Sequence, residues 1–183
     1  MNLHTPLCDL FGIEYPIFAA GMGGVTMAPL AGAISAAGGM GVLGATFCTP
    51  DELRDEIAAV RKITDRPFGV DLLIPGDIPP DLSAREIPPF PGHLRDLLPE
   101  VAGLTGKPPP PLTLELARAQ LEVTLDAKVP LLVSALGTPA WLVDECHRAG
   151  TKVMSIVGSV RQARRLAKLG VDAVIAQGSE AGG

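Results

Sequence analysis

The sequence predicts an α/β fold in which helices cover a parallel sheet. From Tyr15 onward, short apolar runs alternate with longer stretches of helical periodicity, the pattern that produces such a sheet. Glycines stand where several of the helical stretches stop, as expected of helix ends. The 183 residues are 47% hydrophobic and can bury one sizeable core, so we expect a single domain, residues 1–183.

The first half of the chain is expected to hold three strands and two helices. The strands are Pro16–Ala20, Met40–Ala45 and Phe68–Ile74, and the helices run from about Met27 to Ala37 and from Pro50 to about Ile63. Gly38 and Gly39 stop the first helix. Thr49 is a good N-cap for the second, and Pro50 suits its first position.

The regular alternation breaks between Pro75 and Pro111. Eleven of the 18 prolines lie there, including Pro108 to Pro111 in series. Proline removes a backbone donor and ends helices, so we expect an extended or irregular segment with at most a short helix near His93 to Val101. This segment, 75–111, is interpreted as an insertion within the domain, and a lid and a plain surface loop are both open.

The second half restores the alternation. The expected helices are Leu112–Asp126, Thr138–Ala149 and Ser159–Leu169, and the expected strands are Val129–Ser134, Lys152–Val157 and Ala173–Ala176. Gly150 and Gly170 stop the last two helices. Six strand-and-helix units are therefore expected, of which the sixth helix is missing from the sequence.

Composition excludes several classes of function. The net charge of −5 comes from 20 acidic and 15 basic residues without a basic cluster, so we expect no nucleic-acid partner. No segment approaches the roughly 20 apolar residues that cross a bilayer, and the first residues do not form a signal peptide. Cys8, Cys48 and Cys146 form no CxxC pair, which predicts neither disulfides nor a zinc site. A cytoplasmic protein is expected.

The loops at the carboxyl ends of parallel strands gather on one face, where ligands bind. Glycine is abundant at these positions, so backbone N–H groups there and at helix starts can approach a ligand closely. The expected ligand is anionic, or flat and hydrogen-bonding. The stretch Gly21 to Gly24 does not have the GxGxxG spacing of a dinucleotide-binding turn.

The segment Gln177 to Gly183, directly after the last expected strand, is the strongest motif. Alone it fits an ordinary turn as well as a functional one. Together with Pro16–Met22, Thr64–Leu72 and Gly170–Val174 it resembles the nitronate monooxygenases, formerly called 2-nitropropane dioxygenases. The resemblance covers nearly the whole chain apart from the insertion. It implies a (β/α)8 TIM barrel, with about six units present, and FMN across the carboxyl-end face.

The resemblance also implies roles for individual residues. Gly21 and Met22 would line the isoalloxazine ring, and Gln177 and Gly182 would hydrogen-bond the flavin. Asp71 stands where the family usually has an asparagine; a carboxylate donates no hydrogen bond unless protonated, so this contact is altered or moves to the backbone. The full expected FMN-binding set is Ala20, Gly21, Met22, Gly23, Asp71, Ser134, Gln177, Gly178, Ala181, Gly182 and Gly183. No metal site is expected.

The family motif continues into a histidine that is proposed to take a proton from the substrate or to orient it. That residue would follow Gly183, so no catalytic base is assigned. His4, His93 and His147 are expected at the surface; the alternative for His93 is a position in a lid that reaches the site. Cys48 follows a strand on the ligand face, but an idle thiol is the more expected role.

Three functions remain open on this scaffold. The leading hypothesis is an FMN-dependent enzyme that oxidises alkyl nitronates with oxygen. The second is an NADH-dependent flavin reductase acting on quinones or enoyl-ACP. The third is a truncated, non-catalytic fragment, since an open six-stranded sheet leaves two edges uncovered and the family's phosphate site is built largely from strands seven and eight. Three alternatives would stabilise such a chain: pairing with another copy as a homo-oligomer, exchange of elements between copies, or further sequence of a longer protein.

Overall fold

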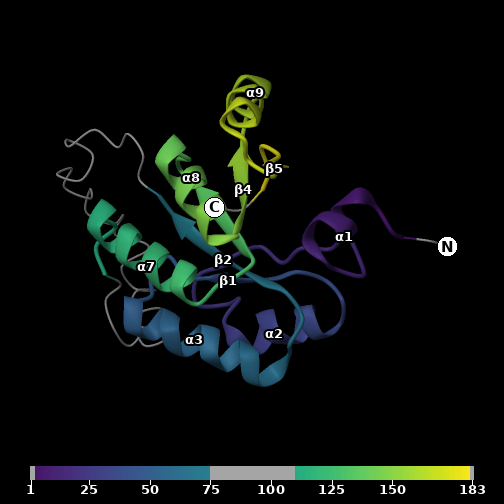
Figure 1. Ribbon diagram of the computed structural model, residues 1–183, viewed down its shortest axis with the longest axis vertical. Coiled ribbons are helices and arrows are strands. Elements are labelled where there is room, and N and C mark those ends of the chain that lie inside the picture. Colours follow the sequence, from purple (N-terminus) through teal and green to yellow (C-terminus); the bar gives the residue numbers. More distant parts are fainter. Residues whose placement is uncertain (1–2, 75–109, 182–183) are drawn as a thin grey trace, which may run out of the picture.

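The computed structural model describes residues 3–74 and 110–181, which form a parallel sheet with helices packed against it (Figure 1). The strands are β1 (Gly41–Gly44), β2 (Phe68–Leu73), β3 (Leu131–Ala135), β4 (Lys152–Val157) and β5 (Ala173–Ala176), hydrogen-bonded in that order. The helices are α1 (Pro6–Phe11), α2 (Ala28–Ala36), α3 (Pro50–Ile63), α7 (Leu114–Asp126), α8 (Ala140–Ala149) and α9 (Val160–Leu169). All pairings are parallel, which confirms the predicted α/β fold.

Local signals set the start of helix α3 as the sequence predicts. The Thr49 hydroxyl accepts a hydrogen bond from the Glu52 N–H at 3.3 Å, and the Glu52 carboxylate accepts one from the Thr49 N–H at 2.7 Å. This reciprocal capping box satisfies two backbone donors that a helix start otherwise leaves unpaired. The helix then buries Leu53, Ile57 and Val60, which lie on one face at helical spacing.

Successive strand residues divide between two apolar clusters. On the helix-covered face, Val70 and Leu72 of β2 pack in one cluster with side chains from α3, α7 and α8. On the other face, which we call the inner face, Val42 and Val133 pack with Phe11 of helix α1. Successive side chains of a strand point to opposite faces of the sheet, which produces this division. It places Asp71, between Val70 and Leu72, on the inner face.

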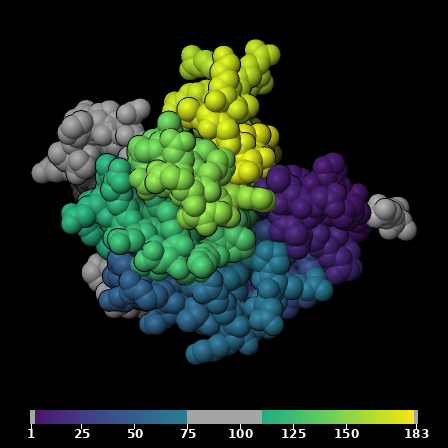
Figure 2. Space-filling view, viewed as in Figure 1, coloured from purple at the N-terminus to yellow at the C-terminus, as the bar shows by residue number. Residues whose placement is uncertain are grey.

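Helix α1 covers the inner face near the amino ends of the strands. Its Phe11 ring packs edge-on against Phe18, with ring centroids 5.4 Å apart, and the cluster extends to Ala173 and Ile175 of β5. Figure 2 shows the consequence: the N-terminal residues, in purple, lie beside the C-terminal ones, in yellow. The opposite, carboxyl-end part of the inner face is left to the loops that follow the strands.

The predictions for the first 20 residues are partly wrong. The expected strand Pro16–Ala20 is a single parallel bridge, Phe18 to Met40, with hydrogen bonds of 2.8 and 2.9 Å on either side of it. Pro16 has no N–H to donate, and the chain turns at Ala20, whose carbonyl accepts from the Met22 N–H, so the pairing stays short. Helix α1 was not expected; it begins at Pro6 and ends at Gly12, whose φ is +68°.

The remaining predicted elements match the structure to within a few residues at their ends. The insertion 75–111 and the short helix near His93 to Val101 fall almost wholly outside the described residues and stay predictions; Pro110 and Pro111 alone are described, as irregular chain. Within residues 3–74 and 110–181, no helix has the length and apolar character that crossing a membrane requires.

A candidate ligand site at the carboxyl ends of the strands

The segment Ala20–Val25, here called the glycine loop, follows the bridged segment at the carboxyl end of the sheet. Buried Thr26 fixes its shape: the Thr26 hydroxyl donates to the Ala20 carbonyl at 2.8 Å, and the Thr26 N–H donates to the Met22 carbonyl at 2.8 Å. Gly24 has a φ of +74°, which favours glycine. Thr26 was not predictable from the sequence, because nothing in the local pattern marks a hydroxyl that donates to a carbonyl six residues earlier.

Glycines let this loop approach the strands closely. A Cβ atom added at Gly44, the last residue of β1, would lie 2.4 Å from the Met22 carbonyl carbon and 2.7 Å from the Gly23 nitrogen. A Cβ atom added at Gly21 would lie 2.2 Å from the Asp71 Cβ. Neither position has room for a side chain, so the glycine loop sits directly against β1 and the inner face of β2.

The loop also presents backbone donors. Within the part of the chain that the structure describes, the N–H groups of Gly21, Gly23 and Gly24 donate to no protein acceptor. Helix α2, which follows the loop, offers less than the sequence suggested: its Ala28 N–H donates to the Glu56 carboxylate at 2.7 Å, and Pro29 has no N–H. The first two positions of the helix therefore offer no N–H donor to a ligand, in contrast to the loop.

Asp71 is the buried charged group of this site. Asp71 is 8% exposed, and its Oδ1 atom is buried without a hydrogen-bond partner among the described residues. Burial raises the pKa of the carboxyl from 3.8 to about 7, because the charged form loses hydration that nothing replaces. Asp71 lies beside Gly21, and among the described residues no group pairs with its buried Oδ1 atom.

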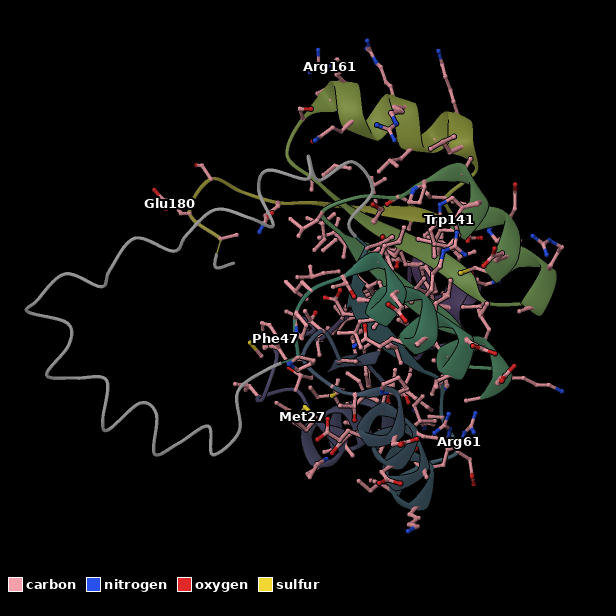
Figure 3. All side chains as sticks on the ribbon, turned by 90° about the vertical axis from the view of Figure 1, so that its left-hand side faces the viewer. Met27, Phe47, Arg61, Trp141, Arg161 and Glu180 are labelled. Atoms are coloured by element: carbon pink, nitrogen blue, oxygen red, sulfur yellow. The ribbon has the colours of Figure 1, made fainter. Side chains whose placement is uncertain are left out.

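The loop after β1 forms the next wall. Buried Gln120, from α7, donates from its amide nitrogen to the carbonyls of Ala45, Thr46 and Cys48 at 3.0, 3.3 and 2.7 Å. This clamp holds the segment that carries Phe47, a half-exposed ring that a Cβ atom at Gly23 would meet at 2.9 Å. In Figure 3, Phe47 and Glu180 lie on the same side of the molecule, away from Arg61.

Removing the Gln120 amide is expected to destabilise the protein. The variant Gln120→Met keeps the buried volume but leaves three carbonyls without their donor, which costs about 1–3 kcal/mol in the free energy of unfolding. Urea denaturation measures the loss. Glu122→Met, at an exposed position of the same helix, is the matched control and is expected to change stability by less than about 0.5 kcal/mol. Equal losses in both variants would argue against the clamp.

Ser134 does not join Asp71. Its side chain is fully buried on the helix-covered face, as register with Leu72 requires, and its hydroxyl donates to the Gly137 carbonyl. Thr138 and Ser155 continue this network with a hydroxyl contact of 2.6 Å. The hydroxyl therefore shapes the turn after β3, and the structure does not place it beside the glycine loop.

The segment after β5 reaches the same end of the sheet. The Gln177 N–H donates to the Val157 carbonyl at 3.0 Å, which extends the pairing of β4 and β5 by one residue. Gln177, Gly178 and Ala181 are exposed, and a Cβ atom at Gly178 would meet nothing within 4 Å. Gly182 and Gly183 lie outside the described residues, so their predicted flavin contacts are untested.

The remaining candidates lie elsewhere or are inactive. His147 contacts the Asp172 carboxylate at 2.9 Å near the amino ends of β4 and β5, at the opposite end of the sheet, and His4 pairs with Asp9 at the surface. His93 lies outside the described residues. Burial, with Glu52 and Glu56 nearby, raises the pKa of Cys48 to about 11, so this thiol stays protonated at neutral pH. The described residues contain no metal-binding cluster.

Comparison with known proteins gives a consistent result. The sequence profile described as "Nitronate monooxygenase" matches residues 4–183. A probable nitronate monooxygenase of Staphylococcus saprophyticus is 30% identical over 187 residues, covering all of this chain and 51% of that protein. A Mycobacterium tuberculosis protein named (3aS,4S,5R,7aS)-5-hydroxy-7a-methyl-1-oxo-octahydro-1H-indene-4-carboxyl-CoA dehydrogenase is 31% identical over 183 residues, covering all of this chain and 41% of that protein.

Solved structures agree. Nitroalkane oxidase from Streptomyces ansochromogenes matches with a TM-score of 0.73 and 34% identity, covering 98% of this chain and 50% of that one. FabK from Thermotoga maritima matches with a TM-score of 0.74 and 32% identity, covering 98% and 46%. The chain thus spans about half the length of these relatives.

Proposed function

The chain belongs to the nitronate monooxygenase family, and on this premise we propose that it is part of an FMN-dependent oxidoreductase that oxidises alkyl nitronates with oxygen. The observation that supports this most is the packing of the glycine loop against Gly44 and Asp71. This packing places backbone N–H donors and the buried Asp71 carboxyl together on the inner face. Gly21 and Gly44 carry no side chain where the loop contacts the strands. FMN, when bound, supplies the electron acceptor that none of these side chains provides.

The residues suit a flat ring with carbonyl groups along its edge. The N–H groups of Gly21, Gly23 and Gly24, which donate to no acceptor among the described residues, would serve as donors for ring oxygens and nitrogens. Met22 is 45% exposed and Phe47 is 49% exposed, and these side chains offer apolar surface beside the donors. Most ligand sites combine such apolar lining with a few fixed polar groups.

We propose these roles for the chain's own residues. Ala20, Gly21, Met22 and Gly23 hold the ring by close backbone approach, and Asp71 contacts its polar edge. A second group from the segment after β5 would close the site from the other side: Gln177, Gly178, Ala181, Gly182 and Gly183. Ser134 supports the site through the turn after β3. The proton-transfer group is not assigned to any residue of this chain.

Oxygen consumption tests the substrate. The purified protein, supplied with FMN, is mixed with propionate 3-nitronate or with NADH under air. Rapid oxygen uptake with the nitronate alone, without any NADH, is the expected result. NADH oxidation without nitronate-dependent oxygen uptake would contradict nitronate oxidation while leaving the flavin site intact.

A second candidate function is an NADH-dependent reductase or dehydrogenase on the same scaffold. It is favoured by the similarity to FabK and to the Mycobacterium tuberculosis carboxyl-CoA dehydrogenase, each at more than 30% identity. The two functions share the flavin face and differ in what donates electrons to it. The same assay therefore separates them: a reductase consumes NADH faster when a quinone or an enoyl thioester is added.

A further inference from the structure

We propose that Asp71 contacts the bound flavin as a neutral carboxylic acid, donating a hydrogen bond to a ring acceptor, so that flavin affinity falls as this carboxyl ionises. The proposal rests on the proposed flavin site and goes beyond it by assigning a protonation state. It also predicts a pH dependence that an amide at this position would not have.

The geometry leaves the Asp71 carboxyl without a hydrogen-bond partner among the described residues. Asp71 is 8% exposed, its Oδ1 has no hydrogen-bond partner among the described residues, and its Oδ2 would lie 2.5 Å from a Cβ atom at Gly21. Glycine at position 21 therefore keeps the space beside the carboxyl free of a side chain. A buried polar atom without a partner costs free energy unless something pairs with it, and the proposed ligand does so.

The side chains packed beside Asp71 do not stabilise the ionised form of its carboxyl. The elements packed against Asp71 place Gly44 of β1, Val133 of β3 and Gly21 of the glycine loop beside it, and none of these side chains titrates. Glu52 and Glu56 of α3 lie near Cys48, where they act on that thiol, and neither contributes to the shift at Asp71. Among the described residues, no cation is available to hold Asp71 in its charged form.

Burial alone then favours the neutral form and raises the pKa of Asp71 to about 7. Below that pH the side chain carries one O–H donor. Above it, the side chain is an acceptor only and would face ring oxygens that are themselves acceptors. Protonation therefore supplies the donor that the ionised carboxylate lacks, whereas an amide at this position would keep its donor at every pH.

Flavin titrations over pH 5.5 to 8.5 test the proposal. The probe is riboflavin, since the phosphate of FMN itself titrates near pH 6, and affinity is read from quenching of flavin fluorescence. For the wild-type protein, affinity is expected to fall by up to about tenfold per pH unit above pH 7, the limit for loss of one proton. Asp71→Asn is expected to bind with a flat profile near the wild-type low-pH affinity, and Asp71→Leu with a flat profile and weaker affinity.

The control variant is Asp126→Asn, at an exposed carboxyl at the end of α7, which is expected to keep the wild-type profile. A second readout uses the protein without flavin. Because the folded-state pKa of Asp71 is raised, the folded protein binds more protons than the unfolded chain between about pH 4 and 7, so this contribution to stability is lost as pH rises through 7. The melting temperature of Asp71→Asn is expected to exceed that of the wild type increasingly as pH rises over this range.

The outcomes are separable. If flavin binds but Asp71→Asn keeps the wild-type pH profile, the protonation proposal is overturned and the flavin site stands. If no flavin binds at any pH, the flavin site and this proposal both fail, whatever the melting temperatures show. If Asp71→Asn does not fold, a pH-independent affinity in the wild-type protein, or a sloping profile in Asp71→Leu, would still overturn the proposal.

Discussion

Replacing Gly44 with alanine is expected to weaken flavin binding about 10- to 100-fold. The added methyl group would lie 2.4 Å from the carbonyl carbon of Met22 and 2.5 Å from its oxygen, both of them backbone atoms that cannot rotate away. The glycine loop must therefore shift, and the donors on it move with it. Overpacking of this kind costs about 1–3 kcal/mol, and each 1.4 kcal/mol lost from binding is a factor of about ten in affinity.

Fluorescence titration with FMN measures the effect of Gly44→Ala. Asp126→Asn, at an exposed position at the end of α7, is the control. That variant is expected to bind FMN within about twofold of the wild type, since an exposed position away from the site changes little. A Gly44→Ala protein with unchanged affinity would show that the glycine loop does not hold the flavin.

Gly41→Ala is expected to cause the largest loss of stability. A Cβ atom at Gly41 would lie 1.9 Å from the Ala31 carbonyl oxygen and 2.6 Å from its carbon, so β1 and α2 would have to separate. The separation would also stretch the hydrogen bond of 3.0 Å from the Gly41 N–H to the buried Ser35 hydroxyl. We expect a loss of about 3 kcal/mol or more, at the upper end of the range for overpacked cores.

Urea denaturation gives this free energy. Gly158→Ala is the control: the nearest atom to a Cβ added there is the Gln162 Oε1 at 3.8 Å, so a change below about 0.5 kcal/mol is expected. A Gly41→Ala variant that unfolds at the wild-type urea concentration would contradict the close packing of β1 against α2. The two glycines of β1 thus test two different contacts. Substitution of Gly44 tests the contact with the glycine loop on the ligand face, and substitution of Gly41 tests the packing of β1 against α2.

Elements with complete local signals were predictable from the sequence. Helix α3 shows this, because its capping box, first-turn proline and apolar stripe all lie within 14 residues. Helix α1 lacks such signals: it has six residues, and its buried face exists only because distant strands supply the inner cluster. The bridged segment at Phe18 was overpredicted as a strand, since an apolar run alone does not show how many residues find a partner.

The candidate site divides in the same way. The positions of Gly21 and Asp71 follow from two strand ends, which parallel topology brings together. Gln120 and Glu56 were missed because their partners lie 72–75 and 28 residues away, and a helical pattern does not distinguish a buried amide from an exposed one. Ser134 was expected at the flavin site, but its side chain lies on the helix-covered face. The face that it takes depends on the register of β3 against β2, which a local sequence pattern does not reveal.

Hydrogen–deuterium exchange with and without FMN tests the flavin site most directly. We expect FMN to slow exchange in the glycine loop, in the segment Ala45 to Cys48 and at the end of β2, and to leave α8 and the amino end of β4 near His147 unaffected. The N–H groups of Gly21, Gly23 and Gly24, which have no acceptor among the described residues, should show the largest change. Protection confined to the amino ends of the strands, or no protection at a saturating FMN concentration, would contradict the proposed flavin site.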